Sequence, residues 1–125
     1  FQRYERGIPQ ADVAVIGKVQ DGRTGTKITF LPDPTIFEET SFRFATLVQR
    51  FREMAFLNRG LTIDFADERT PNGPRLMSFY FEGGVRSFVR YLNKNRPVLH
   101  QPIYVERNVE GTLIEVALQY NTGYN

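Results

Sequence analysis

The stretch from residue 42 to residue 60, FRFATLVQRFREMAFLNRG, has the clearest structural pattern in the chain. Its apolar residues recur at intervals of three and four, which is typical of one face of an α-helix. The apolar positions are Phe44, Leu47, Val48, Phe51, Met54 and Ala55, and Arg43, Arg50, Arg52 and Glu53 face elsewhere. Ser41 is placed to cap the start of the helix and Gly60 its end. The sequence therefore predicts an amphipathic helix from about Phe42 to Arg59, packed on an apolar core.

Beyond this helix the pattern changes to strict alternation. Apolar residues alternate with polar ones around residues 61–65 and again around 77–81, as in half-buried strands. They are Leu61, Ile63 and Phe65 in the first run and Met77, Phe79 and Phe81 in the second. The sequence PNGP at residues 71–74 favours a loop. A β-hairpin with a long tip is therefore expected.

A shorter helix and a last hairpin complete this part of the chain. The helix is predicted from about Val85 to Asn95, and its buried positions are expected to be Val85, Phe88, Val89 and Leu92. The hairpin strands are expected at about 103–107 and 112–119, with a turn through residues 108–111.

Strand patterns also precede the long helix, at residues 2–6, 12–19 and 26–31. They predict an antiparallel meander that ends at Pro32 and Pro34, because proline lacks the backbone donor that a sheet needs. The expected order is three strands, a helix, two strands, a helix and two strands. This order favours an α+β fold, with helices packed on a largely antiparallel sheet.

Composition sets limits on function. The 125 residues are 41% hydrophobic, enough for one core, and 16 basic against 14 acidic residues give a formal charge of +2. That charge is too small to indicate nucleic-acid or membrane binding by itself. Cysteine is absent, so disulfides and thiolate metal sites are excluded, and an intracellular location is expected. No apolar run approaches the length of about 20 residues that spans a bilayer, so we expect a soluble chain. Because strand-like sequence begins at Phe1, we also expect the chain to be a fragment.

Catalytic patterns are missing from the sequence. No histidine or carboxylate constellation suits acid–base catalysis, and His100, between prolines, cannot form a zinc site alone, so a surface position is expected. Glu82, Gly83 and Gly84 precede a helix whose N-terminus could hold an anion. Neither phosphate-loop pattern is present, and these glycines more simply allow a tight turn from strand to helix.

One charge pattern is unusual. Arg86, Arg90 and Lys94 recur every four residues on the second predicted helix, with Arg96 just beyond. Like charges at this spacing destabilise a helix by about 0.2–0.5 kcal/mol per pair. The stripe either faces phosphates or an acidic partner, or is an ordinary solvated face relieved by nearby carboxylates.

The stretch TGTKITFLPD at residues 24–33 resembles the strand motif near the end of the ATPase domain in the B subunits of the bacterial type IIA topoisomerases, gyrase and topoisomerase IV. Further segments agree in order and spacing: EMAFLNRGL at 53–61, DER at 67–69, YFEGG at 80–84, YLNKN at 91–95 and VALQYN at 116–121. The sequences FLN at 56–58 and LNKN at 92–95 are closer to gyrase than to proteobacterial topoisomerase IV.

The resemblance implies both a domain arrangement and a nucleotide site. It makes residues 1–83 the end of a Bergerat-type ATPase domain and residues 84–125 the start of a ribosomal-S5-like transducer domain. Thr26 matches a threonine that helps to bind the adenine end of ATP, and Ile28 matches an apolar residue that lines the pocket. The alternative makes both ordinary strand residues, with Ile28 in the core. Four features of the family would precede Phe1: the catalytic glutamate, the Mg²⁺-binding asparagine, the aspartate that binds adenine, and the glycine-rich lid. The lysine loop that reaches the γ-phosphate would follow Asn125, so the isolated chain should neither hydrolyse ATP nor bind it tightly.

The resemblance also implies the partners of the whole protein. They are ATP and Mg²⁺, the gyrase A subunit, a second B subunit that dimerises on ATP binding, and double-stranded DNA, in the cytoplasm and without a membrane. The whole protein would be an ATP-hydrolysing DNA topoisomerase that introduces negative supercoils. Arg86, Arg90 and Lys94 could then face DNA. A second hypothesis is a non-catalytic binding or scaffold module that uses the basic helix.

Overall fold

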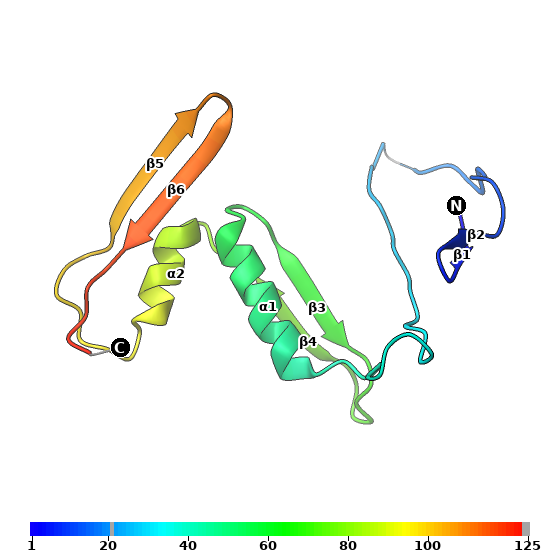
Figure 1. The fold of residues 1–125 in the computed structure, drawn as a ribbon, viewed down its shortest axis with the longest axis horizontal. Helices are drawn as coiled ribbons and strands as arrows, with labels where there is room; N and C mark the ends of the chain where they lie inside the picture. The colour runs from blue at the N-terminus through cyan, green and yellow to red at the C-terminus, as the bar shows by residue number, and fades with distance from the viewer. Residues whose placement is uncertain (21, 124–125) are drawn as a thin grey trace. The chain divides into compact units, whose positions relative to one another are not determined.

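The computed structural model describes residues 1–20 and 22–123. The chain forms two compact units, which divide after Ser41 and are described separately. The element order is two short strands, a helix, two strands, a second helix and two strands (Figure 1). Every strand pair is antiparallel. The α+β prediction is therefore confirmed, although the strands form three two-stranded sheets in place of one larger sheet.

The first unit has little regular structure. Strand β1 (Tyr4–Glu5) pairs with β2 (Ile8–Pro9) through a tight turn in which Gly7 has a φ of 80°. Arg6 Nε donates to Asp33 Oδ2 at 2.9 Å, which joins this turn to the loop that leads to the next helix.

The predicted meander was wrong in its second and third strands. Residues 12–19 and 26–31 lie outside any strand, although their alternating pattern favours one. A strand needs a neighbouring edge to accept and donate its backbone hydrogen bonds. Ala14 exchanges backbone hydrogen bonds with Phe1, at 2.9 Å and 2.6 Å, but within the described residues this pair does not extend into a strand. Apolar side chains of both segments remain in solvent, with Val15 92% exposed.

Helix α1 (Phe44–Leu57) is close to its predicted span. Its N-cap residue is Arg43 without a side-chain cap, so the expected cap at Ser41 was wrong. Arg43 is extended, with φ −84° and ψ 117°, and Ser41 therefore lies too far before the first turn to reach its free N–H groups. At the other end, the backbone and side-chain nitrogens of Asn58 both donate to Met54 O. Gly60, with a φ of 84°, then turns the chain away.

The buried face of α1 differs from prediction at three positions, Arg52, Met54 and Phe56. Ala55 and Phe56 are its buried residues, whereas Met54 is exposed. Arg52 was expected to face away from the core, but its guanidinium lies 5.7 Å from the Phe79 ring centroid and 5.4 Å from that of Tyr91. Its Nη1 also donates to the Tyr91 hydroxyl at 2.9 Å. The aliphatic part of arginine can cover apolar surface while its charged end remains bonded, and spacing alone does not reveal this.

The hairpin after α1 confirms the alternation. Strand β3 (Ile63–Asp67) pairs with β4 (Arg75–Phe79), and the loop between them contains the predicted turn sequence. Helix α1 packs against both strands. The Phe65 ring lies 5.4 Å from that of Phe44 and 5.1 Å from that of Phe51, between centroids. This contact fixes the hairpin against the first turns of α1.

Helix α2 (Gly84–Leu92) is shorter than predicted and follows β4 after a tight turn. Gly84 has a φ of 52°, which an L-residue adopts only with strain, so the simpler interpretation of the glycine pair fits the structure. Leu92 was expected to be buried but is exposed, because the helix ends there and Asn93 forms its cap.

An aromatic stack joins the two helices. The Phe56 ring is 3.6 Å from Phe81, 5.0 Å from Phe88 and 5.4 Å from Tyr91, measured between ring centroids. Phe56 is only 2% exposed. The stack therefore includes residues on both sides of the predicted domain boundary at Gly83, which itself stays a prediction.

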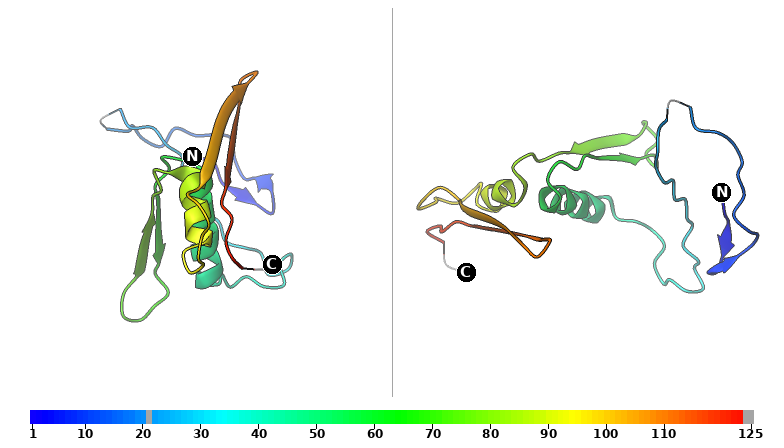
Figure 2. Two further views of the ribbon diagram at one scale, coloured as in Figure 1. Left: turned by 90° about the vertical axis from the view of Figure 1, so that its left-hand side faces the viewer. Right: turned by 90° about the horizontal axis from the view of Figure 1, so that it is seen from above.

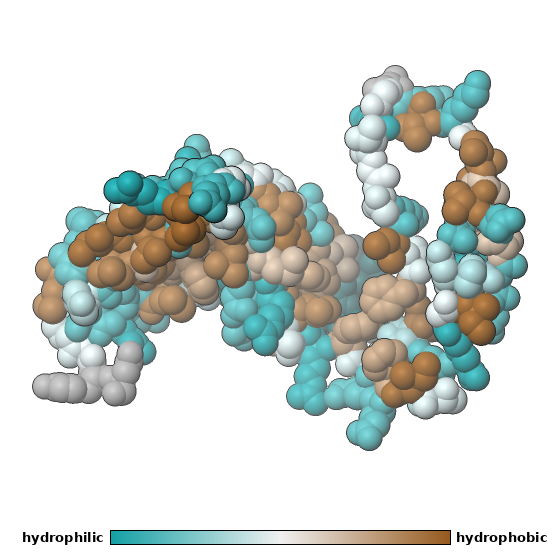
Figure 3. Space-filling view, turned by 45° about the horizontal axis from the view of Figure 1, so that its top comes forward, coloured by the Kyte–Doolittle hydropathy of each residue, from teal (hydrophilic) through white to brown (hydrophobic). Residues whose placement is uncertain are grey.

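Strands β5 (Ile103–Val109) and β6 (Thr112–Leu118) form the last hairpin, as expected. The two strands run side by side (Figures 1 and 2). Strand β6 packs against α2. One face carries opposed apolar residues, such as Val105 and Val116, and both are half exposed. Figure 3 shows how much apolar surface is open on the face drawn. Within the described residues, no helix has the length and apolar character that crossing a membrane requires.

Candidate functional site

The residues expected to line a nucleotide site lie in the first unit. Thr26 and Ile28 are in a segment without regular structure; both are exposed, Ile28 by 81%. A hollow lies elsewhere, on the β3–β4 hairpin, between residues such as Asp64 and Leu76. No structural feature gathers Thr26 and Ile28 into a pocket within the described residues, so their role stays a prediction.

The basic stripe begins on α2. Arg86 and Arg90 belong to the helix, and Lys94 follows its cap, so the third cation lies just beyond the helical face. All three are exposed, and among the residues that the structure describes none of them forms an ion pair. Arg86 is stacked instead on Tyr104 of β5, with its guanidinium carbon 4.5 Å from the ring centroid. Stacking leaves the edge N–H groups of a guanidinium open to an anion.

A charged cluster around Tyr104 was not predicted. Tyr104 OH lies 2.6 Å from Glu106 Oε2 and 2.5 Å from Glu115 Oε1. These hydrogen bonds, the one to Glu106 above all, raise the pKa of the Tyr104 hydroxyl well above its usual range. Glu106 and Glu115 face one another directly across β5 and β6. Arg59, just after α1, approaches Glu106 with 3.7 Å between Nη1 and Oε2.

This cluster is weakly held. An exposed ion pair contributes about 0–1 kcal/mol, and an exposed cation–π contact about 0.5–1 kcal/mol. Like charges directly opposite in a β-ladder oppose pairing by a similar amount. The two arginines therefore offset the repulsion between the carboxylates and leave little surplus. The alternation of tyrosine and glutamate at 104 and 106 was the available signal in the sequence, but it does not reveal either arginine.

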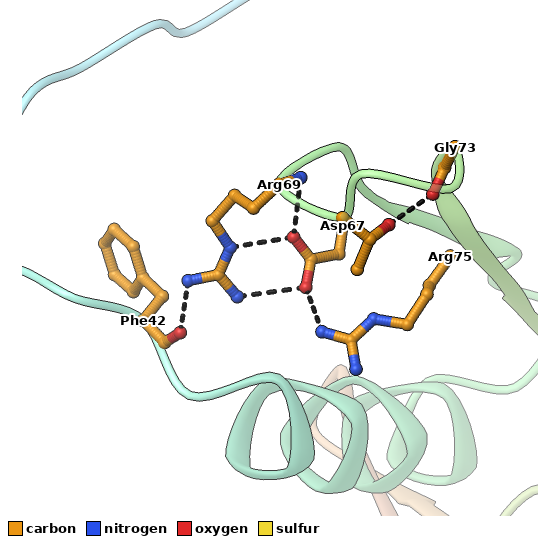
Figure 4. Close-up of polar contacts among 6 residues, drawn as sticks. Phe42, Asp67, Arg69, Gly73 and Arg75 are labelled. Atoms are coloured by element: carbon orange, nitrogen blue, oxygen red, sulfur yellow. Dashed lines mark hydrogen bonds and ion pairs between the residues drawn. The ribbon is translucent and has the colours of Figure 1, made fainter.

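A second ionic cluster is strongly held. Figure 4 shows Asp67, whose side chain is 2% exposed, between two arginines. Arg69 donates from Nε to Asp67 Oδ1 at 2.7 Å and from Nη2 to Oδ2 at 3.0 Å, while Arg75 Nη2 donates to Oδ2 at 2.5 Å. The bonds from Arg69, then those from Arg75, hold the pKa of Asp67 far below its usual range. The bidentate geometry of the Arg69 contact strengthens these charge-assisted bonds.

The Asp67 cluster positions the start of α1. Arg69 Nη1 donates to the carbonyl of Phe42 at 2.6 Å (Figure 4). The Arg75 guanidinium lies 3.8 Å from the centroid of the Phe44 ring. The end of β3 and the start of β4 are thereby fixed to the residues that open the helix. The resemblance marked residues 67–69 as a motif, and the structure gives that motif a structural role.

His100 was expected at the surface, but it is half buried and takes part in local hydrogen bonds. Its Nε2 accepts the backbone N–H of Tyr120 at 3.1 Å, and its Nδ1 lies 2.6 Å from Gln101 O. This pattern fits a neutral ring that donates from Nδ1. Within the described residues, no group of three potential metal ligands occurs.

Among curated proteins, the chain is 46% identical over 126 residues to the DNA gyrase B protein of Bacillus cereus. It is 47% identical over 126 residues to that of Halalkalibacterium halodurans and 42% identical over 125 residues to that of Staphylococcus aureus. These matches cover 98–99% of the chain. The chain belongs to the DNA gyrase B family. No family model matches it.

Solved gyrase B structures share the fold. The 43K ATPase domain of Thermus thermophilus gyrase B, solved in complex with an aminocoumarin, matches with a TM-score of 0.82 and 32% identity. That match covers 99% of this chain and 33% of the other. The B subunit of Myxococcus xanthus DNA gyrase matches with a TM-score of 0.75 and 28% identity, over 99% of this chain and 36% of the other. The chain spans about a fifth to a third of the curated gyrase B proteins quoted, from 19% to 30% of their length.

Proposed function

We propose that this chain is a segment of the B subunit of an ATP-dependent type II DNA topoisomerase that introduces negative supercoils. The observation that carries the proposal is the 42–47% identity to gyrase B proteins along almost the entire chain. In this proposal the segment joins the end of the ATPase domain, residues 1–83, to the start of the transducer, residues 84–125. Its own role is mechanical, because it transmits ATP-driven closure of paired subunits.

The longer protein would use ATP and Mg²⁺, in the cytoplasm, with the gyrase A subunit, a second B subunit and double-stranded DNA as partners. Thr26 and Ile28 would form one wall of its adenine pocket. Both side chains are exposed, as expected if the rest of the adenine pocket is formed by other parts of the longer protein. Calorimetric titration of the isolated chain with Mg-ATP should give no tight binding and no turnover. A submicromolar dissociation constant would contradict this assignment of the pocket.

The function itself is tested with the longer protein. Combined with its A subunit, relaxed plasmid and ATP, it should produce negative supercoils, and the same mixture without ATP should not. ATP-dependent decatenation without supercoiling would favour topoisomerase IV. Inactivity in both assays would favour the other class of function, a non-catalytic module that binds through the basic helix.

The DNA-facing role of Arg86, Arg90 and Lys94 is a separate proposal. Their exposure and lack of ion pairs among the described residues support it. Replacing all three with glutamine in the longer protein should weaken DNA stimulation of the ATPase and leave DNA-independent turnover intact. The loss should shrink as salt rises, because each phosphate contact adds to the salt dependence of DNA binding. Identical DNA titration curves at low salt would remove the stripe from the DNA contact surface.

A further inference from the structure

We propose that Arg59, Arg86 and the Tyr104–Glu106 edge of β5 form a separable joint that positions the β5–β6 hairpin on the helix pair. This inference rests on the proposed function, because the joint would connect the ATPase part to the transducer. It assigns coupling residues that lie outside the predicted nucleotide wall.

One side of the joint is a rigid block. Helices α1 and α2 share the stack centred on Phe56, and Arg52 bonds from α1 to the Tyr91 hydroxyl of α2. Gly84 packs closely on α1, since a Cβ at this position would lie 3.4 Å from Arg59 Cβ and 3.7 Å from Phe56 O. The two helices cannot separate without exposing buried aromatic surface, so they move together.

The hairpin packs on this block where β6 meets α2, and two sets of polar contacts of different character add to that packing. Near the end of α2, the Asn93 side chain donates to Gln119 Oε1 at 3.1 Å and accepts from Asn121 Nδ2 at 2.8 Å. Asn93 is 9% exposed, so this amide contact is protected from water. Further along β5, the contacts are those of Arg59 with Glu106 and of Arg86 with Tyr104. The amide contact is therefore a fixed point, and the charged contacts form the joint.

The joint is built to open at low cost. Arg59 is 60% exposed and Glu106 43%, and water can replace their 3.7 Å contact. Without the arginines, Glu106 and Glu115 would repel one another across the hairpin. The orientation of the hairpin thus depends on which cations lie beside it. If the basic stripe binds DNA phosphates, DNA binding would also act on β5, because Arg86 is stacked on Tyr104.

The test uses the longer protein with its A subunit. Arg59→Gln should leave the ATPase rate near wild type and raise the ATP consumed per unit of linking-number change by about two- to fivefold, the range expected for one exposed pair. Arg50→Gln is the matched control, because Arg50 is a similarly exposed arginine whose ion pair, with Glu53, stays within α1. Thermal melts should show that both variants are as stable as wild type.

A charge exchange gives the decisive outcome. Arg59→Glu should uncouple the enzyme more than Arg59→Gln, and adding Glu106→Arg should restore at least half of the loss. Equal coupling in wild type and Arg59→Glu, or no restoration by the exchange, would overturn the joint. A wild-type protein without ATP-dependent supercoiling would overturn the proposed function and the coupling role together. The joint has a separate test in amide hydrogen exchange. Exchange in β5–β6 should be faster in Arg59→Gln than in Arg50→Gln, and equal exchange in the two variants would overturn the joint.

Discussion

Replacing Phe56 with alanine should damage the second unit more than any other truncation of an aromatic side chain on α1. The side chain is 2% exposed and its ring contacts Phe81, Phe88 and Tyr91. A fully buried Phe→Ala change costs about 3–5 kcal/mol, because apolar contact is lost and a cavity remains. Small domains are stable by only about 5–15 kcal/mol, so this loss takes the unit close to unfolding.

The matched control is Phe51→Ala on the same helix. Phe51 is half buried and packs edge-on against the Phe65 ring, so its truncation should cost about 1–2 kcal/mol. Urea denaturation followed by far-UV circular dichroism separates the two. With a slope of roughly 1.5 kcal/mol per molar, the midpoint should fall by about 2–3 M for Phe56→Ala and by about 1 M for Phe51→Ala. Equal midpoints would refute the placement of the core at the junction of α1 and α2.

Two further substitutions test the ionic cluster and the turn before α2. Asp67→Asn should lower the urea midpoint at pH 7, and its difference from wild type should shrink as the pH falls below about 4. A carboxyl whose pKa is depressed in the folded state stabilises the fold above its unfolded-state pKa, and this stabilisation is lost as acid protonates the folded carboxyl. Asp64→Asn, exposed on the same strand, should show no such difference, and a difference unaffected by pH would contradict the ionic role of Asp67. Gly84→Ala should cost about 1–2 kcal/mol in melts, since Gly84 is held at a φ of 52°. Gly25→Ala, with no atom within 4 Å of the added methyl and no left-handed φ, should be nearly neutral, and equal effects would show that the turn is not constrained.

Local periodicity predicted the elements whose partners are close in sequence. Helix α1 and the β3–β4 and β5–β6 hairpins are close to their expected positions, because a helix bonds four residues back and a hairpin pairs across a short turn. The strands expected at 12–19 and 26–31 failed for the opposite reason. Their alternation indicates a side that could be buried, but a strand also needs a continuous ladder of backbone hydrogen bonds. Within the described residues, the pairing of Ala14 with Phe1 does not extend into such a ladder.

The polar contacts depended on partners that no local pattern identifies. Arg52 looks like a surface cation in the helical pattern, yet its hydrogen-bond partner Tyr91 is 39 residues away. Arg59 and Glu106 are even further apart along the chain. By contrast, the basic spacing of Arg86 and Arg90 could be seen at once, but the ring beneath Arg86 could not. The sequence shows where the cations lie along the chain, and the structure shows which side chains they contact.

The shared aromatic stack has a practical consequence for shortening the protein. A truncation after Gly83 would remove Phe88 and Tyr91 and leave the faces of Phe56 and Phe81 in water. A piece that starts at Gly84 would carry the complementary bare surface on α2. Uncovered aromatic patches of this kind favour aggregation. Truncations that preserve solubility should instead fall before Phe42, where the compact units divide, and should keep the two helices on one polypeptide.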